Sequence, residues 1–222
     1  MNTSVTHTAR LLGAGLRALL VLTLVTGVLY PLLITGIAQG LFPGRANGSE
    51  TEANGRVVGS ALIGQSYNLP LKEGQQTPEP DLKWFQGRPQ NGLGTNSVNT
   101  QYDLILSGAT NRSADSAELV QWVRDAKAAV IRDNSVGGHT VKPSDVPADA
   151  VTSSGSGLDP DISPAYADLQ VHRIAERNGL PVEHVQNLVD EHTESRTLGF
   201  LGEPRVNVLE LNTALERLVT ER

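Results

Sequence analysis

The stretch Ala18–Ala38, ALLVLTLVTGVLYPLLITGIA, contains no charged side chain and decides the architecture of this chain. As a helix that rises about 1.5 Å per residue, it extends over about 30 Å, the thickness of a bilayer's hydrocarbon core. Inside lipid every backbone N–H and C=O must be paired within the segment, so a single apolar run has to be helical. The sequence therefore predicts one transmembrane helix over residues 18–41, after a short N-terminal segment at 1–17.

Pro31 lies inside this apolar run. Proline lacks a backbone N–H and removes one helical hydrogen bond, which predicts a kink near Tyr30 that a partner helix could accommodate.

A cleaved secretory signal is the alternative to a retained anchor. Arg10 and Arg17 precede the apolar run, and Gly36-Ile37-Ala38 resembles a small-x-small cleavage site. A signal's apolar region is shorter, about 7 to 15 residues, and Pro31 lies in the middle of this one. Length therefore favours a retained anchor over a secreted protein that is released after Ala38.

The cations that flank the helix indicate its orientation. Arg10, Arg17 and the free amine precede it, whereas Arg45 and Arg56 follow it among acidic residues. Because positive charge concentrates on the cytoplasmic side, we expect a single-pass protein of the cell membrane. Its N-terminus would be cytoplasmic and its domain at 42–222 extracytoplasmic.

The composition of the domain excludes several classes of function. All 24 acidic residues follow the anchor, together with 16 of the 18 cations, so residues 42–222 have a net charge of −8. A surface of this sign makes nucleic acid an unsuitable partner. The chain has no cysteine, which excludes disulfides, thiolate metal sites and thiol nucleophiles.

The domain is expected to be mixed α+β, with strands and loops up to about residue 112 and helices after it. Residues 42–55 are rich in turn formers and suggest an irregular exit from the membrane, 56–66 suit a short strand, and an aliphatic run at 103–106 leads into a turn. Capping residues and apolar periodicity predict helices that begin at Asp115, at Pro164 after Ser163, at Pro181 and after Asn207, the second of them ending at Gly179.

Residues 65–112 form a long irregular segment, in which 14 of 48 residues are Pro, Gly or Asn. Loops of this length inside a compact domain are usually functional or disordered. Trp84 and Phe85 either pin this loop to the core or, together with Arg88, contact a partner.

The usual catalytic signatures are absent from the sequence. No P-loop pattern, HExxH or GxSxG occurs, and His184 and His192 would lie about 12 Å apart along one helix, too far to share an ion. We therefore expect no catalytic residue and no metal site.

The small-residue loop Thr152–Asp161 is the best candidate for a special site. Its members Ser154, Gly155, Ser156, Gly157 and Asp159 could bring backbone N–H groups to a nucleotide phosphate, or contact a partner, ahead of the following helix. Asp159 and Asp161 would repel a phosphate, which favours a structural turn in which either carboxylate bonds nearby backbone. A rival interpretation is a freestanding extracytoplasmic hydrolase that uses Ser153, Ser154 or Ser156, and a third is an anchored or secreted binding protein.

Six blocks of the chain, taken in order, resemble the C subunit of the Kdp-type potassium-transporting P-type ATPase. Besides the anchor with Tyr30-Pro31, they are GSALIGQ at 59–65, FQGRP at 85–89, SGATN at 107–111, SGLD at 156–159 with ISP at 162–164, and VNVLELN at 206–212. Residues 65–84 are longer than is usual in the family, and Gly108-Ala109-Thr110 replaces a common Gly-Gly-Ser.

This resemblance implies a non-catalytic accessory subunit of an ATP-driven, high-affinity potassium uptake complex. Its partners would be a channel-like potassium-binding subunit, an ATP-hydrolysing P-type subunit and the lipid bilayer. The family description adds a catalytic chaperone that raises the ATP affinity of the hydrolysing subunit. The family description also includes a contact of this subunit with nucleotide, so that ATP would reach the chain through the complex. The charge count opposes a direct contact, because it places the domain outside the cell while ATP is inside.

Overall fold

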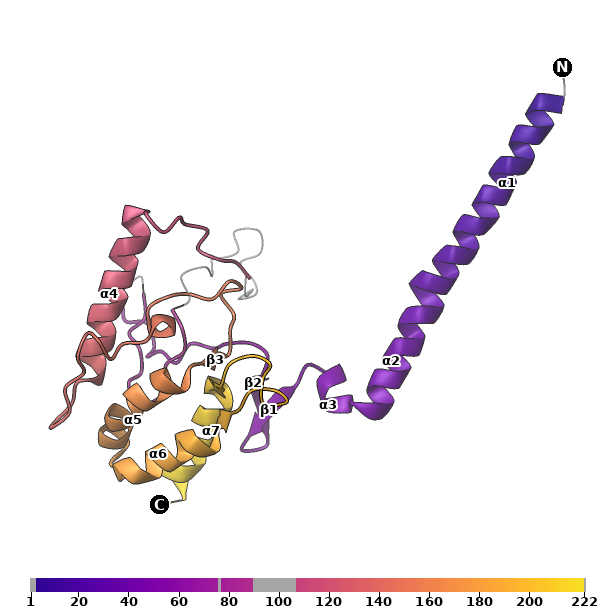
Figure 1. The fold of residues 1–222 in the computed structure, drawn as a ribbon. Coiled ribbons are helices and arrows are strands. Elements are labelled where there is room, and N and C mark those ends of the chain that lie inside the picture. The colour runs from indigo at the N-terminus through magenta and orange to yellow at the C-terminus, as the bar shows by residue number, and fades with distance from the viewer. Residues whose placement is uncertain (1–2, 76, 90–106, 222) are drawn as a thin grey trace. The chain divides into compact units, whose positions relative to one another are not determined.

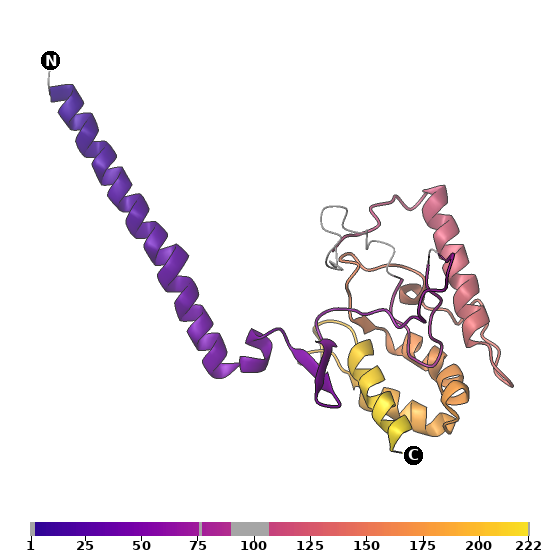
Figure 2. The ribbon, with the colours of Figure 1, turned by 180° about the vertical axis from the view of Figure 1, so that it is seen from behind.

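The computed structural model describes residues 3–75, 77–89 and 107–221. The chain divides into two compact units, Met1–Glu50 and Thr51–Arg222. Figure 1 labels the helices and strands of both units, and Figure 2 shows them from behind.

The first unit is dominated by one long helix with three parts, α1 (Thr3–Leu24), the π-helical turn η1 (Val25–Leu29) and α2 (Tyr30–Leu41). The helix includes residues 3–17, which precede the predicted span. By length and composition, Ser4–Leu41 could cross a membrane. Apolar side chains such as Leu20 and Leu33 are exposed over its length, as lipid-facing residues would be.

The π-helical turn lies where the sequence predicted a kink. Tyr30 donates its N–H to the Val25 carbonyl, five residues earlier, just before Pro31. The Thr26 hydroxyl donates to the Leu22 carbonyl at 2.7 Å. Pro31 has no N–H to donate, so one backbone hydrogen bond of the helix is absent. The π-helical turn and the Thr26 hydrogen bond lie directly before this position.

Residues 42–55 are more regular than we expected. They contain the short helix α3 (Pro43–Ala46) and the strand β1 (Glu50–Ala53), which pairs with β2 (Arg56–Ser60). Asn54 and Gly55 have φ of 52° and 73°, the conformation of a two-residue hairpin turn. The prediction of an irregular exit was therefore wrong at β1, while the predicted strand at 56–66 is present as β2.

The segment from Ala61 to Pro89 is mostly irregular, with an isolated bridge between Asn68 and Pro80. The predicted aliphatic run at 103–106 lies outside the described residues.

Four longer helices follow, α4 (Ala117–Asn134), α5 (Pro164–Asn178), α6 (Val182–Glu191) and α7 (Val208–Thr220), with a short 3₁₀ turn η2 (Ala148–Ala150). The N-cap of α4 is Ser116, whose hydroxyl accepts from the Leu119 N–H, so the predicted cap at Asp115 was wrong by one residue. Ser163 caps α5 and Asn207 caps α7 as predicted.

A small antiparallel sheet of order β3-β5-β4 joins these helices. It consists of β3 (Asp161–Ile162), β4 (Thr193–Glu194) and β5 (Arg205–Asn207). The sequence predicted none of the three strands, and Asp161 was expected to lie in a loop. Val206 of β5 pairs with Ile162 on one side and with Thr193 on the other. The second unit is therefore mixed in helix and strand, as predicted.

The core lies between α5, α6 and α7 and the inner side of this sheet. Ile174, Val185, Val206 and Leu211 are buried at its centre. Phe85 of the irregular segment is also fully buried in it. The long loop is therefore fixed to the helices by a core residue as well as by the polar contacts described below.

Candidate functional site

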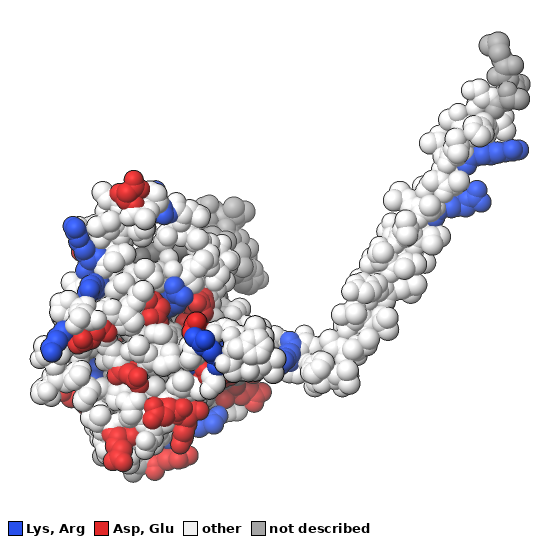
Figure 3. Space-filling model, viewed as in Figure 1, with Lys and Arg blue, Asp and Glu red and all other residues white. Residues whose placement is uncertain are grey.

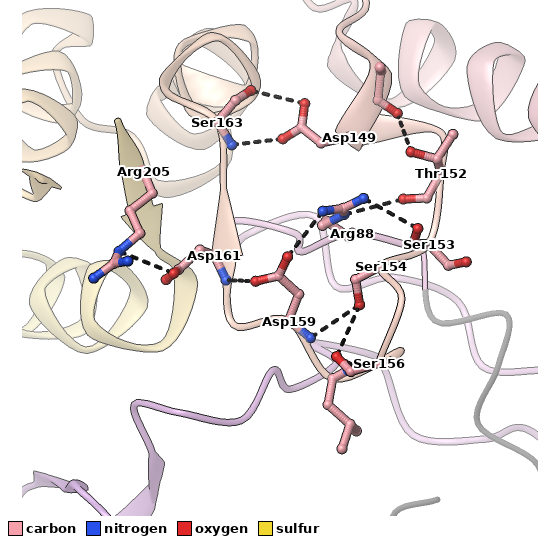
Figure 4. A network of polar contacts seen from close by, with 12 residues as sticks. Arg88, Asp149, Thr152, Ser153, Ser154, Ser156, Asp159, Asp161, Ser163 and Arg205 are labelled. Carbon is pink, nitrogen blue, oxygen red and sulfur yellow. Dashed lines mark hydrogen bonds and ion pairs between the residues drawn. The ribbon is translucent and has the colours of Figure 1, made fainter. Parts of the chain in front are cut away.

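Arg88 links the irregular segment to the loop that the sequence singled out (Figure 4). Its Nη1 lies 3.0 Å from Asp159 Oδ2, its Nη2 donates to the Ser153 carbonyl at 3.2 Å, and its Nε donates to the Thr152 carbonyl at 3.3 Å. A guanidinium has a rigid fork of donors, which suits it to such a multiple contact. Arg88 thus crosslinks two stretches of backbone.

The hydroxyls of Ser154 and Ser156 support the turn between them (Figure 4). Ser154 Oγ accepts from the Asp159 N–H at 3.4 Å and lies 3.4 Å from Ser156 Oγ. Ser156 Oγ accepts from the Leu158 N–H at 3.1 Å. Both hydroxyls therefore bond within their own loop, in the manner of a structural turn.

Two glycines of neighbouring blocks allow close backbone contacts here. Gly157 has φ of 69°, and a Cβ on it would lie 2.8 Å from the Gly108 carbonyl oxygen. Gly64 donates its N–H to the Leu158 carbonyl at 2.8 Å, and a Cβ there would lie 2.5 Å from the Asp159 carbonyl oxygen. Gly155, by contrast, faces open space.

The block at 107–111 is also bonded to the loop. Ser156 accepts, through its carbonyl oxygen, the Gly108 N–H at 2.7 Å and the Ser107 hydroxyl at 3.1 Å. Residues 107 and 108 thus add a short backbone contact to the turn.

The two acids of the loop bond to protein groups. Asp159 Oδ1 accepts from the Asp161 N–H at 3.1 Å, as the structural-turn interpretation expected. Asp161 faces Arg205 Nε at 3.2 Å and accepts from Asn207 Nδ2 at 3.2 Å. Burial raises the pKa of Asp161, and the nearby Arg205 opposes that rise. Two carboxylates so close to the backbone N–H groups of the loop would repel a bare phosphate.

The start of α5 is held by a third carboxylate, that of Asp149. Asp149 accepts from the Ser163 N–H at 2.7 Å and from the Ser163 hydroxyl at 2.9 Å (Figure 4). Ser163 Oγ in turn accepts from the Tyr166 N–H. This N-terminus therefore carries its own anionic partner, which satisfies donors that an external anion would otherwise use.

The backbone of Phe85 and Gln86 is held by two buried amide side chains. Asn212 accepts from the Phe85 N–H and donates to its carbonyl, both at 2.9 Å. Gln170 does the same to Gln86, at 2.7 and 3.1 Å. We call these four bonds the amide clamp. The two amides give the backbone of Phe85 and Gln86 the hydrogen-bond partners that a neighbouring strand would otherwise supply. The irregular segment can therefore be buried without unpaired backbone groups.

Arg173 is fully buried beside the clamp. It donates to the carbonyls of Leu82 and Trp84 at 2.5 and 3.0 Å, to Asn134 Oδ1 at 2.8 Å and to Gln170 Oε1 at 2.6 Å. Burial lowers its pKa to about 10, which still leaves it charged at neutral pH. Arg173 therefore fixes the irregular segment, α4 and α5 to one another.

The three candidate partner residues of the irregular segment lie in different environments. Phe85 is buried in the core, Trp84 is partly buried with its ring 6.0 Å from that of Tyr67, and Arg88 faces Asp159. In the structure, Trp84 and Phe85 thus pack onto the core. A contact of Trp84 or Arg88 with a partner remains a prediction.

A cleft of about 350 Å³ lies between the irregular segment, α4 and α5. Arg88, Tyr166, Gln170 and Arg173 are among its lining residues. Both arginines donate to protein carbonyls, and burial raises the pKa of Tyr166 to about 12. The groups that could recognise an anion in this cleft are therefore engaged in holding the fold.

The four histidines of the second unit lie in different environments. His184 is exposed on α6, and His192 follows that helix with Nδ1 2.8 Å from the Leu188 carbonyl oxygen. His172 is half-buried and stacks on His139, with ring centroids 3.9 Å apart. Among the residues that the structure describes, no three His, Asp or Glu side chains are grouped to hold a metal ion.

The sequence did not predict a role for Gln170 or Arg173, and Asn212 was noted only as a member of the block at 206–212. One local feature of the sequence could have indicated them. Gln170 and Arg173 lie among the buried apolar residues of α5, which are Leu169, Val171 and Ile174. Polar side chains that interrupt an apolar face need partners, although the sequence does not say which.

Comparisons with known proteins complete the description. A family model described as "KdpC: K+-transporting ATPase, c chain" matches residues 12–217. The chain is 79% identical over 219 residues to the potassium-transporting ATPase KdpC subunit of Streptomyces coelicolor, covering 99% of this chain and 97% of that protein. It is 47% identical over 207 residues to the subunit of Gemmatimonas aurantiaca (91% and 92% covered) and 40% identical over 204 residues to that of Mycobacterium tuberculosis (92% and 96%).

Proposed function

The chain belongs to the KdpC family, the c chains of K+-transporting ATPases, and on that premise we propose that it is a non-catalytic accessory subunit of a high-affinity potassium uptake complex. A channel-like subunit would bind potassium and a P-type subunit would hydrolyse ATP. This chain would assist their assembly and act as a catalytic chaperone that raises the ATP affinity of the hydrolysing subunit.

The observation that carries the proposal is that the blocks by which the chain resembles its family are hydrogen-bonded to one another. Gly64 bonds to Leu158, and Arg88 faces Asp159. The Asn207 side chain donates to the Ala61 carbonyl at 2.8 Å, and the amide clamp joins residues 85 and 212. Groups used in this way build a rigid surface, which suits a subunit that acts by contact with partners.

The candidate loop supports a role without chemistry of its own. Activated serine nucleophiles are bonded to a general base, usually histidine. Here the Ser154 hydroxyl bonds to the Asp159 N–H and the Ser156 hydroxyl to the Leu158 N–H. Replacing both serines by alanine should leave ATP hydrolysis by an assembled complex unchanged, provided that the variant melts as the parent does.

We propose that the N-terminus is cytoplasmic and the second unit extracytoplasmic. The support is charge, since Arg10 and Arg17 are the only charged residues of the long helix. Figure 3 shows blue side chains towards the N-terminal end of that helix and white ones over the rest of it. Because the chain has no cysteine, single cysteines at Val5 and at Glu73 can be labelled separately. In intact cells an impermeant maleimide should label Glu73→Cys only, and the reverse pattern would contradict this topology.

On this topology the effect on ATP affinity passes through the partner subunits, because ATP is cytoplasmic. The test compares purified complexes with and without the chain. The KM for ATP should rise several-fold without it, and adding the chain back should restore it. An unchanged KM in a complex that still assembles would refute the chaperone role and leave family membership intact.

Assembly is tested by deletion. Removing the chain from cells should abolish co-purification of the potassium-binding and ATP-hydrolysing subunits, and with it potassium uptake from low external concentrations. Uptake that persists unchanged would contradict an assembly role.

A further inference from the structure

The loop between β4 and β5 exposes three large apolar side chains. Leu198 is 80% exposed, Phe200 68% and Leu201 51%. They belong to one turn, which is closed because Thr197 and Leu201 each donate a backbone N–H to the other's carbonyl at 2.9 Å. We call residues 197–201 the apolar turn. Single exposed apolar residues are common on soluble proteins, but three in one turn indicate an interaction surface.

The apolar turn is preformed. Leu198 and Gly199 have φ of 55° and 82°, a region that side chains such as leucine rarely adopt. The Gly199 N–H donates to the Arg196 carbonyl at 2.9 Å. A turn held by these bonds loses little conformational freedom when it docks, so its apolar area contributes more fully to binding.

The charges beside the apolar turn are paired with one another. Arg196 lies 2.6 Å from Glu203, and Arg205 lies 2.8 Å from Glu194. Residues 197–202, TLGFLG, carry no charge. Entry of this tip into an apolar medium would therefore not require an unpaired charge to lose its water.

The chain itself limits what the turn can reach. Leu41, the last residue of α2, is followed by ten peptide steps to Thr51, which span at most about 35 Å. The end of β5 lies against the end of β2, because the Asn207 side chain donates to the Ala61 carbonyl at 2.8 Å. Both ribbon views draw the β4–β5 loop at the β1–β2 hairpin, where the chain enters the second unit (Figures 1 and 2). If α1 and α2 span the bilayer, as the proposed function assumes, the apolar turn is tethered near the lipid surface, and a weak contact becomes effectively intramolecular.

We propose that the apolar turn inserts into the interfacial region of the lipid bilayer and gives the second unit a membrane contact besides its anchor. A turn whose apolar side chains extend into solvent suits a fluid lipid surface, which needs no complementary groove. The net charge of −8 after residue 41 predicts a preference for zwitterionic over anionic lipid.

The test places a fluorescent label on the turn. The full chain with Leu198→Cys, carrying an environment-sensitive dye, is reconstituted into phosphatidylcholine vesicles, with Glu183→Cys on exposed α6 as the matched control. The dye at 198 should be blue-shifted and several-fold less accessible to an aqueous quencher than the dye at 183. Adding Phe200→Ser and Leu201→Ser should remove this protection without changing the melting temperature.

Two outcomes would overturn the insertion of the turn, and a third would overturn the predicted lipid preference. Equal quenching of the two dyes, in chains that still float with the vesicles, would reject insertion while leaving the anchor intact. Protection that arises only with the partner subunits would assign the turn to a protein interface. Stronger protection in anionic than in zwitterionic vesicles would contradict the charge argument.

Discussion

Asn212 and Phe85, 127 residues apart, are joined by two hydrogen bonds between the amide side chain of the first and the backbone of the second. Both bonds are buried. The pair connects the last described helix to an otherwise irregular segment and makes the conformation of residues 82–88 dependent on α7.

Asn212→Ala should lower the free energy of unfolding by about 2–4 kcal/mol, because it leaves the buried N–H and carbonyl of Phe85 without partners. Denaturant unfolding followed by tryptophan fluorescence measures this change, because Trp84 is adjacent to Phe85 in the sequence. Gln121→Ala is the control, since Gln121 bonds to Asp125 on the exposed face of α4, and its effect should be within about 0.5 kcal/mol. Equal effects of the two variants would count against the clamp.

Gly157→Ala should destabilise the chain by about 2 kcal/mol or more, since the new Cβ meets the Gly108 carbonyl oxygen and φ is positive. Gly155→Ala is the matched control two residues away, where a Cβ meets open space. Thermal melting should place Gly155→Ala near the parent and Gly157→Ala well below it. Identical melting of both variants would contradict the close approach of the two backbones.

Arg88→Lys should loosen the loop at residues 152–159, because an ammonium group cannot reproduce the fork that bonds two carbonyls and Asp159. Amide hydrogen exchange should become faster at Leu158, Asp159 and Asp161. With Asp159→Asn as the second member, a double-mutant cycle should give a coupling energy of about 1 kcal/mol for this partly exposed pair. Additive effects would show that the two side chains are independent.

The free energy of unfolding should decrease in acid because of the stacked histidines His139 and His172. Burial, and then the neighbouring His139, lowers the pKa of His172 below its ordinary value of 6.5. The unfolded chain therefore binds this proton more readily, so the contribution to stability is complete above pH about 6.5 and decreases as the pH falls towards the folded pKa. His172→Gln should flatten the dependence of unfolding free energy on pH between about 8 and 5, whereas His184→Gln should not.

Local chemistry explains which elements could be predicted. Ser163, Pro164 and Gly179 define α5 within one stretch of sequence, and the helix has the predicted bounds. Asp115 and Ser116 are adjacent residues that can both cap a helix, and only the folded backbone shows that Ser116 does so. The Asn54-Gly55 turn carried a hairpin signal, but one of its strands, β1, is polar and short, and was predicted to be irregular.

In the candidate site too, contacts between residues close in sequence could be predicted, whereas contacts between distant residues could not. The bond from the Asp161 N–H to Asp159 spans two residues and was expected. Arg88 meets Asp159 across 71 residues, and Gln86 meets Gln170 across 84. Neither pairing leaves a periodic or capping pattern in the sequence. The two-residue β4 and three-residue β5 are likewise too short to show alternation.

The amide clamp has a consequence for biosynthesis. Translation delivers the membrane helix first and Asn212 near the end, so Phe85 emerges from the ribosome well before the side chain that will bond its backbone. At about 5–20 residues per second, that wait lasts on the order of ten seconds. During this interval the core of the nascent second unit is incomplete, and the segment around Phe85 is the part that a chaperone would have to shield.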